Sequence, residues 1–329
     1  MRAHTKSLAL CAAIVSLALP SAAGTTPPYP DKPITIVVPY GPKSDTADYA
    51  HLLATQVNKY LDGIELIEVV RAGDSGAKAA TEVMLTPADG YTLMMGRVGS
   101  QAISPALKPN LPYRWHDFTF IGVIEIDPLI CAVRSDSPYK TVRDLAQAIR
   151  KKPGTLKYST VGTGTIQNIS VQYLMKLSGL VAGSIEGVGF PGGPEAAAAL
   201  LDGRVAFICT SAVSLVQPIK GGKLRAFFTT APGRLPELPD IQNAREVGLR
   251  DMSALVGWSA LIGPPGLPET IVARWRAALK KLATDKEWIS EITKRGAIPA
   301  IGTSKDNDRF IKEQYELYDW LAQSLGLQE

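Results

Sequence analysis

Three segments of the chain combine glycines or hydroxyl groups with the expected start of a helix, a pattern that can bind an anion. They are 39–46 (Pro-Tyr-Gly-Pro-Lys-Ser-Asp-Thr), 159–165 (Ser-Thr-Val-Gly-Thr-Gly-Thr) and 190–194 (Phe-Pro-Gly-Gly-Pro). In the first, Asp45 or Thr46 can cap a helix, and Lys43 adds a positive charge. The alternative for each segment is a turn that binds nothing, with Lys43 a solvated surface lysine.

Arg97 is the second candidate anchor for an anion. It follows an expected strand at 92–95, in the stretch Gly-Arg-Val-Gly-Ser-Gln that also contains Ser100. A guanidinium at the carboxyl end of a strand can grip a carboxylate with two parallel hydrogen bonds. A surface arginine without a ligand is the alternative.

Catalytic and cofactor signatures are weak. The stretch 98–102 lacks the second glycine of a nucleophile elbow, and neither His51 nor His116 lies in a motif that marks a general base. The glycines at 162 and 164 are not followed by the third glycine of a dinucleotide fingerprint or by the lysine of a phosphate-binding loop. We therefore expect no catalytic residue, no cofactor and no metal site.

Apart from Cys11 near the start of the chain, the cysteines are Cys131 and Cys209. Both lie in apolar runs that are typical of strands. We expect buried thiols. A disulfide between them stays open, because sequence alone does not give the distance between their Cα atoms.

The elements that must position these residues alternate along the chain. Short β-branched runs at 34–38, 64–70 and 92–95 are separated by amphipathic stretches, and the alternation resumes from 141 to 229. This pattern is typical of an α/β protein. Extended runs at 118–126 and 129–134, and again near 254–262, would connect two such units.

We therefore expect two lobes, each a sheet flanked by helices, joined by two crossing strands. The predicted limits are 24–126 with 258–329 for lobe 1 and 127–257 for lobe 2. About 306 residues remain after a predicted signal peptide, which suits two domains better than one core.

The first 23 residues have the order of a secretory signal peptide. Arg2 and Lys6 precede an apolar run at 8–19, which is too short to span a membrane and is followed by Pro-Ser-Ala-Ala. Cleavage after Ala23 predicts a periplasmic protein without a transmembrane segment. The formal net charge of +4 then falls to about +2 with the loss of Arg2 and Lys6, which argues against nucleic-acid binding.

Beyond these patterns, the chain resembles the substrate-binding proteins of tripartite tricarboxylate transporters, often called the Bug family. The resemblance covers essentially the whole mature chain and rests on short motifs in the family's order. They are 29–34 (Tyr-Pro-Asp-Lys-Pro-Ile), 37–40, 87–96 (Pro-Ala-Asp-Gly-Tyr-Thr-Leu-Met-Met-Gly), 111–113, 117–118, 220–226 (Lys-Gly-Gly-Lys-Leu-Arg-Ala), 235–240 (Leu-Pro-Glu-Leu-Pro-Asp), 257–258 and 263–268 (Gly-Pro-Pro-Gly-Leu-Pro).

This resemblance implies a two-lobed clamshell of the periplasmic binding-protein type (type II-like) that closes on a carboxylated ligand and docks on membrane subunits. It also implies that 40–46, 162–168, 190–194 and Thr210 face the ligand. With Arg97, the candidate ligand-binding residues are Tyr40, Pro42, Lys43, Ser44, Asp45, Thr46, Ser100, Gly162, Gly164, Thr165, Asn168, Phe190, Gly192, Gly193 and Thr210.

The sequence departs from the family at three of these places. Ala47 stands where the family commonly has aspartate, Asn168 where histidine is frequent, and Thr210 where aspartate is frequent. Direct charge could therefore replace part of the backbone and water contacts. We hypothesise that Lys43 and Arg97 each face a carboxylate of a dicarboxylate, with Tyr40 or Phe190 stacking on a ring if the ligand is aromatic.

We therefore expect a monomeric solute-binding protein that hands a small carboxylate to the membrane subunits of a tripartite transporter. Two other functions remain: an exported enzyme acting on a small organic acid, and a sensory subunit that presents the liganded clamshell to a membrane receptor.

Overall fold

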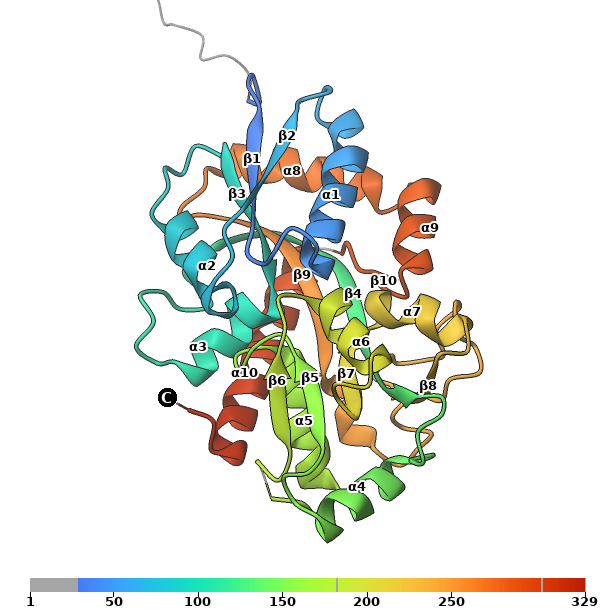
Figure 1. Cartoon of the computed structure of the whole chain (residues 1–329). Helices are drawn as coiled ribbons and strands as arrows, with labels where there is room; N and C mark the ends of the chain where they lie inside the picture. The colour runs from blue at the N-terminus through green and yellow to red at the C-terminus, as the bar shows by residue number, and fades with distance from the viewer. Residues whose placement is uncertain (1–28, 182, 303, 329) are drawn as a thin grey trace, which may run out of the picture.

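The computed structural model of the chain describes residues 29–181, 183–302 and 304–328, so the predicted signal peptide at 1–23 lies outside it. Two lobes are visible in Figure 1, one around β1–β3 and the other around β5–β7, with β4 and β9 passing between them. The strands are β1 (Ile34–Val38), β2 (Leu66–Val70), β3 (Thr92–Arg97), β4 (Thr119–Arg134), β5 (Lys157–Thr160), β6 (Glu186–Gly189), β7 (Phe207–Ser211), β8 (Leu224–Thr229), β9 (Val256–Gly263) and β10 (Ile298–Pro299).

The helices cover both faces of the sheets. They are α1 (Asp45–Val57), α2 (Ala77–Met84), α3 (Ser104–Leu107), α4 (Val142–Lys151), α5 (Ile166–Leu177), α6 (Gly193–Leu201), α7 (Ala212–Lys220), α8 (Glu269–Leu282), α9 (Lys286–Lys294) and α10 (Ser304–Leu325). Within the described ranges, no helix is long and apolar enough to cross a membrane.

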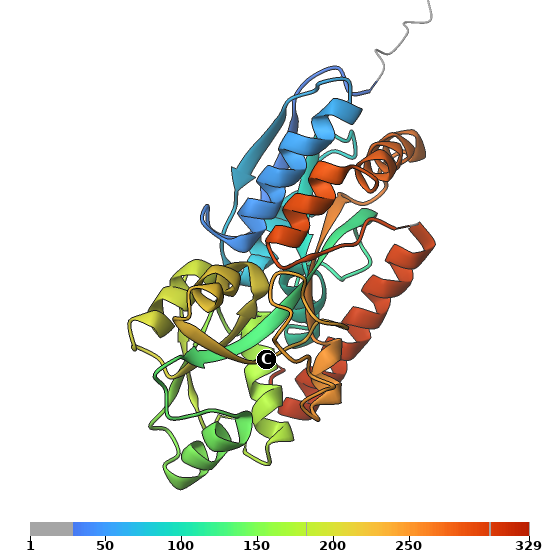
Figure 2. The ribbon, with the colours of Figure 1, turned by 90° about the vertical axis from the view of Figure 1, so that its right-hand side faces the viewer.

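The first sheet is built around β1, which pairs in parallel with β2 and β3. Ile34, Ile36 and Val38 pack with α1 and α8 on one face, whereas Val37 packs with α2 on the other. Figure 2 shows α9 in front beside α1, with α8 seen nearly end-on to their right. A strand covered on both faces needs a continuous apolar run, which explains why β1 coincides with the predicted strand.

The second sheet has β5 between β6 and β7, in parallel, and α5, α6 and α7 follow these strands along the chain. β4 joins it from the other side of β7 and also pairs antiparallel with β8. In parallel βαβ units the helices begin at the carboxyl ends of the strands, so the starts of α5 and α6 lie at one end of this sheet.

β4 connects the two sheets as one continuous strand of 16 residues. The expectation of two separate extended runs there is wrong. Residues up to Pro128 pair with β9, and residues from Leu129 pair with β7 and β8. Proline has no N–H to donate to a ladder, and here it lies where the pairing partner changes.

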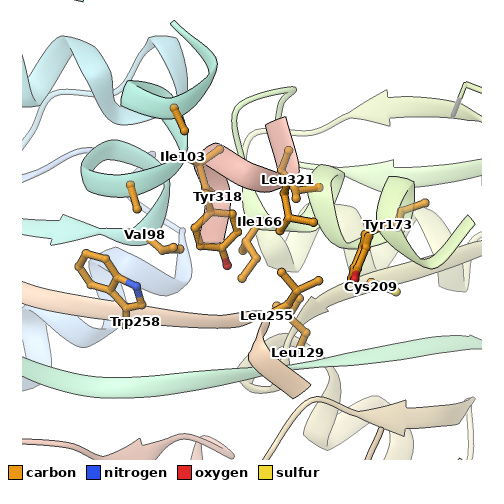
Figure 3. Packing of buried hydrophobic residues seen from close by; sticks show 14 of the residues in the cluster. Val98, Ile103, Leu129, Ile166, Tyr173, Cys209, Leu255, Trp258, Tyr318 and Leu321 are labelled. Carbon is orange, nitrogen blue, oxygen red and sulfur yellow. The ribbon is translucent and has the colours of Figure 1, made fainter. Parts of the chain in front are cut away.

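The lobes share a hydrophobic core around these crossing strands. Figure 3 shows Trp258 of β9 and Tyr318 of α10 in the same cluster as Ile166 of α5 and Cys209 of β7. The predicted lobe limits, 126/127 and 257/258, fall inside β4 and β9. They stay a prediction, because both strands run continuously through these points.

Cys131 and Cys209 form a disulfide, so the expectation of buried thiols is wrong and the alternative is correct. The two residues are directly opposite each other in the antiparallel pairing of β4 with β7. They are 78 residues apart in sequence, and only the strand order of the folded sheet makes them neighbours.

Candidate functional site

A cleft between the lobes is lined by four loops, each at the carboxyl end of a strand. The residues are Tyr40, Ser44, Asp45 and Thr46 before and within α1, Arg97, Val98 and Gly99 after β3, Val161, Thr165, Ile166 and Gln167 around the start of α5, and Gly192 and Gly193 at the start of α6. The cavity between these walls has a volume of about 30 Å³ in this closed arrangement of the lobes. The three segments singled out from the sequence therefore contribute to one cavity.

The starts of α5 and α6 leave backbone N–H groups at this cavity. Neither Thr165 nor Gly192, the residues before the two helices, makes a side-chain capping bond. The first N–H groups of a helix have no partner inside it, and the helix dipole adds partial positive charge there. Pro194 lacks an N–H, so α5 offers more donors than α6.

Gln167 adds a side chain to the start of α5. It is 7% exposed and lines the cavity. No hydrogen bond joins its side-chain amide to another residue in the described part of the chain, so the amide is free to bond within the cavity. A ligand in the cavity could supply a partner for this amide.

The start of α1 differs from the prediction. Ser44, not Asp45 or Thr46, is the N-cap, and its Oγ accepts a hydrogen bond from the backbone N–H of Ala47 at 3.2 Å. The prediction of the cap was wrong because all three residue types can cap a helix. With Ser44 in this role, the carboxylate of Asp45 is available for other contacts.

Asp45 contacts the opposite lobe. Its Oδ1 accepts a hydrogen bond of 2.8 Å from Ser214 Oγ of α7. Burial, with a smaller contribution from the nearby Asp127 carboxylate, raises the pKa of Asp45 to about 6, although Ser214 and Arg97 act in the opposite direction. Asp45 is therefore ionised at neutral pH at some energetic cost.

Arg97 is the centre of a buried charge cluster between the sheets. Its guanidinium bonds Glu125 Oε1 at 3.1 Å, Asp127 Oδ2 at 3.0 Å and Ser259 Oγ at 3.2 Å. These bonds use three of its five N–H donors, so the chain's own side chains, two carboxylates and a hydroxyl, take most of its capacity. Burial raises the pKa of Glu125 to about 8, and Arg97 offsets this only in part.

Lys43 and Pro42 lie outside the cavity. They line a separate surface hollow together with Ala47, His51 and Glu68. The lysine is exposed to solvent. The structure thus separates Lys43 and Arg97, which the sequence hypothesis placed on one ligand.

Other predicted residues lie behind the cavity wall. Ser100 is buried and bonds the backbone of Arg97, and the Asn168 side chain is held by Tyr158 and by the carbonyl of Thr163. The Phe190 ring lies 5.2 Å from the guanidinium of Arg204, and Thr210 is fully buried with an unpartnered Oγ1.

Gly162 and Gly164 lie where the lobes touch. A Cβ added at these positions would lie 3.4 Å and 3.0 Å from Ser75 Oγ of the opposite lobe. Gly162 has φ 126°, which also favours glycine. With the Asp45–Ser214 bond, these contacts bring the lobes together around the cavity.

Five residues that line the cavity are not among the candidates named one by one: Val98, Gly99, Val161, Ile166 and Gln167. Ile166 and Gln167 do lie within 162–168, the range that the family resemblance places at the ligand, and Val161 lies within the segment 159–165. All are adjacent to predicted residues. Apolar side chains and a glutamine carry no charge signal in a sequence, and only the position of the loops could have indicated them.

Comparisons with known proteins agree with this architecture. Residues 50–327 match the model of the tripartite tricarboxylate transporter family receptor. A protein of Bordetella pertussis, described only as a member of an uncharacterised protein family, is 27% identical over 316 residues, covering 96% of each chain.

Solved structures with the same fold include two from Rhodopseudomonas palustris. MatC, solved with bound malate, is 28% identical, has a TM-score of 0.81 and covers 89% of this chain and 99% of its own. A second protein, solved with adipate, is 25% identical, has a TM-score of 0.83 and covers 91% of this chain and 98% of its own. The family model and these likenesses place the chain among periplasmic solute-binding receptors rather than enzymes, and the chain belongs to the tripartite tricarboxylate transporter receptor family.

Proposed function

We propose that this protein captures a small carboxylate between its lobes in the periplasm and delivers it to the membrane subunits of a tripartite transporter. The observation that carries the ligand class is the start of α5. Its uncapped N–H groups and the buried, unpartnered amide of Gln167 meet in one cavity. Such a helix start binds a carboxylate without needing a full positive charge.

The proposal extends to dicarboxylates. Malate and adipate, found in the two related structures, are both dicarboxylates. In this chain the second anchor is the part of the Arg97 guanidinium that lines the cavity, where three of its five donors are already used. An aliphatic acid suits this cavity better than an aromatic one, because Phe190 faces Arg204 and Tyr40 is held through its hydroxyl by the carbonyl of Ser75.

Binding to the mature chain, residues 24–329, tests this function. Isothermal titration with aliphatic and aromatic mono-, di- and tricarboxylates should give stoichiometric binding of at least one dicarboxylate, with the ligand recovered unchanged. Gln167→Ala should weaken that binding about 3- to 10-fold, the loss of one hydrogen bond. Lys43→Ala is the control and should change the affinity less than twofold; absence of binding by every acid would contradict the proposal.

Export is tested separately. The full chain, expressed in a Gram-negative host, should appear in the periplasmic fraction. Its mass should be that of a protein whose first residue is Gly24. A cytoplasmic product that retains residues 1–23 would contradict this part of the proposal.

A further inference from the structure

The cavity contains an anion of its own. Asp45 lines it, is 8% exposed, and accepts a hydrogen bond from Ser214 at Oδ1, while the hydroxyl of Ser211 also favours the ionised carboxylate. The other oxygen, Oδ2, lies close to the start of α6: a Cβ added at Gly193 would lie 2.5 Å from it. The chain's own carboxylate thus occupies the α6 side of the cleft.

Asp45 has no cation of its own among the described residues. The nearest guanidinium, Arg97, bonds Glu125 and Asp127, and no ion pair joins Arg97 to Asp45. Even if Glu125 carries a proton, Asp127 alone balances Arg97. When it is ionised, Asp45 is therefore a buried negative charge that only hydroxyl groups, the start of α6 and the shared charge of Arg97 stabilise, with no ion pair of its own.

The charge of Asp45 makes the α6 side of the cleft electrostatically different from the α5 side. A ligand carboxylate is attracted to the start of α5 and repelled from Asp45. A hydrogen-bond donor on the ligand would instead be attracted to Asp45, because it could donate to Oδ2. A cationic donor would also balance the negative charge of Asp45. A ligand with carboxylates alone would leave the acceptor unpaired in a closed cleft.

We propose that Asp45 determines specificity, so that the cleft selects a small carboxylic acid bearing a hydroxyl or ammonium group that donates to Asp45 while a carboxylate binds at the start of α5. This inference rests on the proposed function and narrows its substrate class. It depends on the placement of Asp45 directly after the Ser44 cap, which leaves the Asp45 carboxylate free of the capping role.

Matched ligand series test the inference. Succinate, malate and aspartate differ only in the group at C2, and propionate, lactate and alanine form the corresponding monocarboxylate series. Titrated at pH 7.5 against the mature chain, a hydroxy or ammonio acid of at least one series, in one of its enantiomers, should bind at least 10-fold more tightly than its unsubstituted parent. Preference for malate or lactate identifies a hydroxyl, and preference for aspartate or alanine an ammonium group.

Two variants test whether the preference for hydroxy or ammonio acids depends on the Asp45 side chain. Asp45→Asn keeps the shape and removes the charge, and should reduce the preference to less than 3-fold while binding of the unsubstituted parent is retained or strengthened. Asp240→Asn makes the same change on the exposed surface and should leave the preference unaltered.

The outcomes are distinct. Equal affinity of the wild-type chain for parent and substituted acids, or a preference that survives in Asp45→Asn, overturns the inference and leaves carboxylate capture intact. Failure of the wild-type chain to bind any of the acids overturns the proposed function and the inference together.

Discussion

The start of α5 and the charge cluster around Arg97 lie on the same cleft, yet they are built in opposite ways. At α5 the donors are uncharged N–H groups without a side-chain cap and an amide that bonds no other described residue. At Arg97 a full charge is present, but Glu125, Asp127 and Ser259 already bond it. The comparison teaches that a charged residue near a site offers a ligand only the hydrogen-bonding capacity that the chain leaves free, because a buried charge must first be balanced by the chain.

The largest expected effect is on stability, at the charge cluster. Arg97→Leu leaves Asp127 buried without its cation and should lower the free energy of unfolding by about 3–5 kcal/mol. Urea denaturation of the mature chain measures this loss.

Arg71→Ala serves as the matched control for Arg97. The ion pair of Arg71 with Glu82 is exposed, so its loss should cost less than about 1 kcal/mol. Similar costs for the two variants would mean that the cluster is not a buried structural unit.

The next effect concerns the pH dependence of stability. The pKa of Asp45 is raised by burial to about 6, so the folded state binds this proton more tightly than the unfolded state. Ionisation therefore destabilises the fold, and stability falls as pH rises from about 4 through 6.

Asp45→Asn should remove this cost. The variant should be about as stable as the wild type at pH 4 and about 1–3 kcal/mol more stable at pH 8, from the shift of the pKa of Asp45 from 3.8 to about 6. Urea unfolding at both pH values measures the difference; an equal difference at both would show that Asp45 does not titrate in this window.

Lobe contact at the α5 loop gives a smaller effect. Gly164→Ala places a Cβ 3.0 Å from Ser75 Oγ of the opposite lobe, which should hinder closure and weaken ligand binding about 10-fold without a comparable loss of stability. Gly189→Ala, where a Cβ meets nothing within 4 Å, is the control. Calorimetry of both variants with the same ligand makes the comparison, and unchanged affinity in Gly164→Ala would exclude a role for this contact in closure.

The smallest predicted effect is that of Gln167→Ala on affinity, described above. The two variants separate two contributions of the α5 region to binding. Gln167→Ala removes a contact with the ligand, whereas Gly164→Ala obstructs closure of the lobes. A stability loss in either that matches Arg97→Leu would remove the distinction between the two regions.

The fold could largely be predicted from the sequence because its elements follow local patterns. The predicted strand at 34–38 coincides with β1, and the one at 92–95 lies within β3. The sequence predicts two extended runs, 118–126 and 129–134, where the structure has the single strand β4, and Pro128 lies where β4 changes pairing partners. The disulfide was not assigned because the pairing of β4 with β7 is a long-range property.

The site was harder to predict for a related reason. The loops at 39–46, 159–165 and 190–194 were recognised because glycines and hydroxyls before helices are local signals. Whether Arg97 is free or bonded depends on Glu125 and Asp127, which are far from it in sequence. The charge of Lys43 made it a candidate anchor, but the residue lies on the outer surface of its loop.

A crystal structure of the mature chain with its tightest-binding carboxylic acid tests the central claim most directly. The account predicts a carboxylate oxygen about 3 Å from backbone N–H groups at the start of α5, with the Gln167 amide as a further donor. A carboxylate held by Lys43, or one that makes no contact with the start of α5, would contradict it.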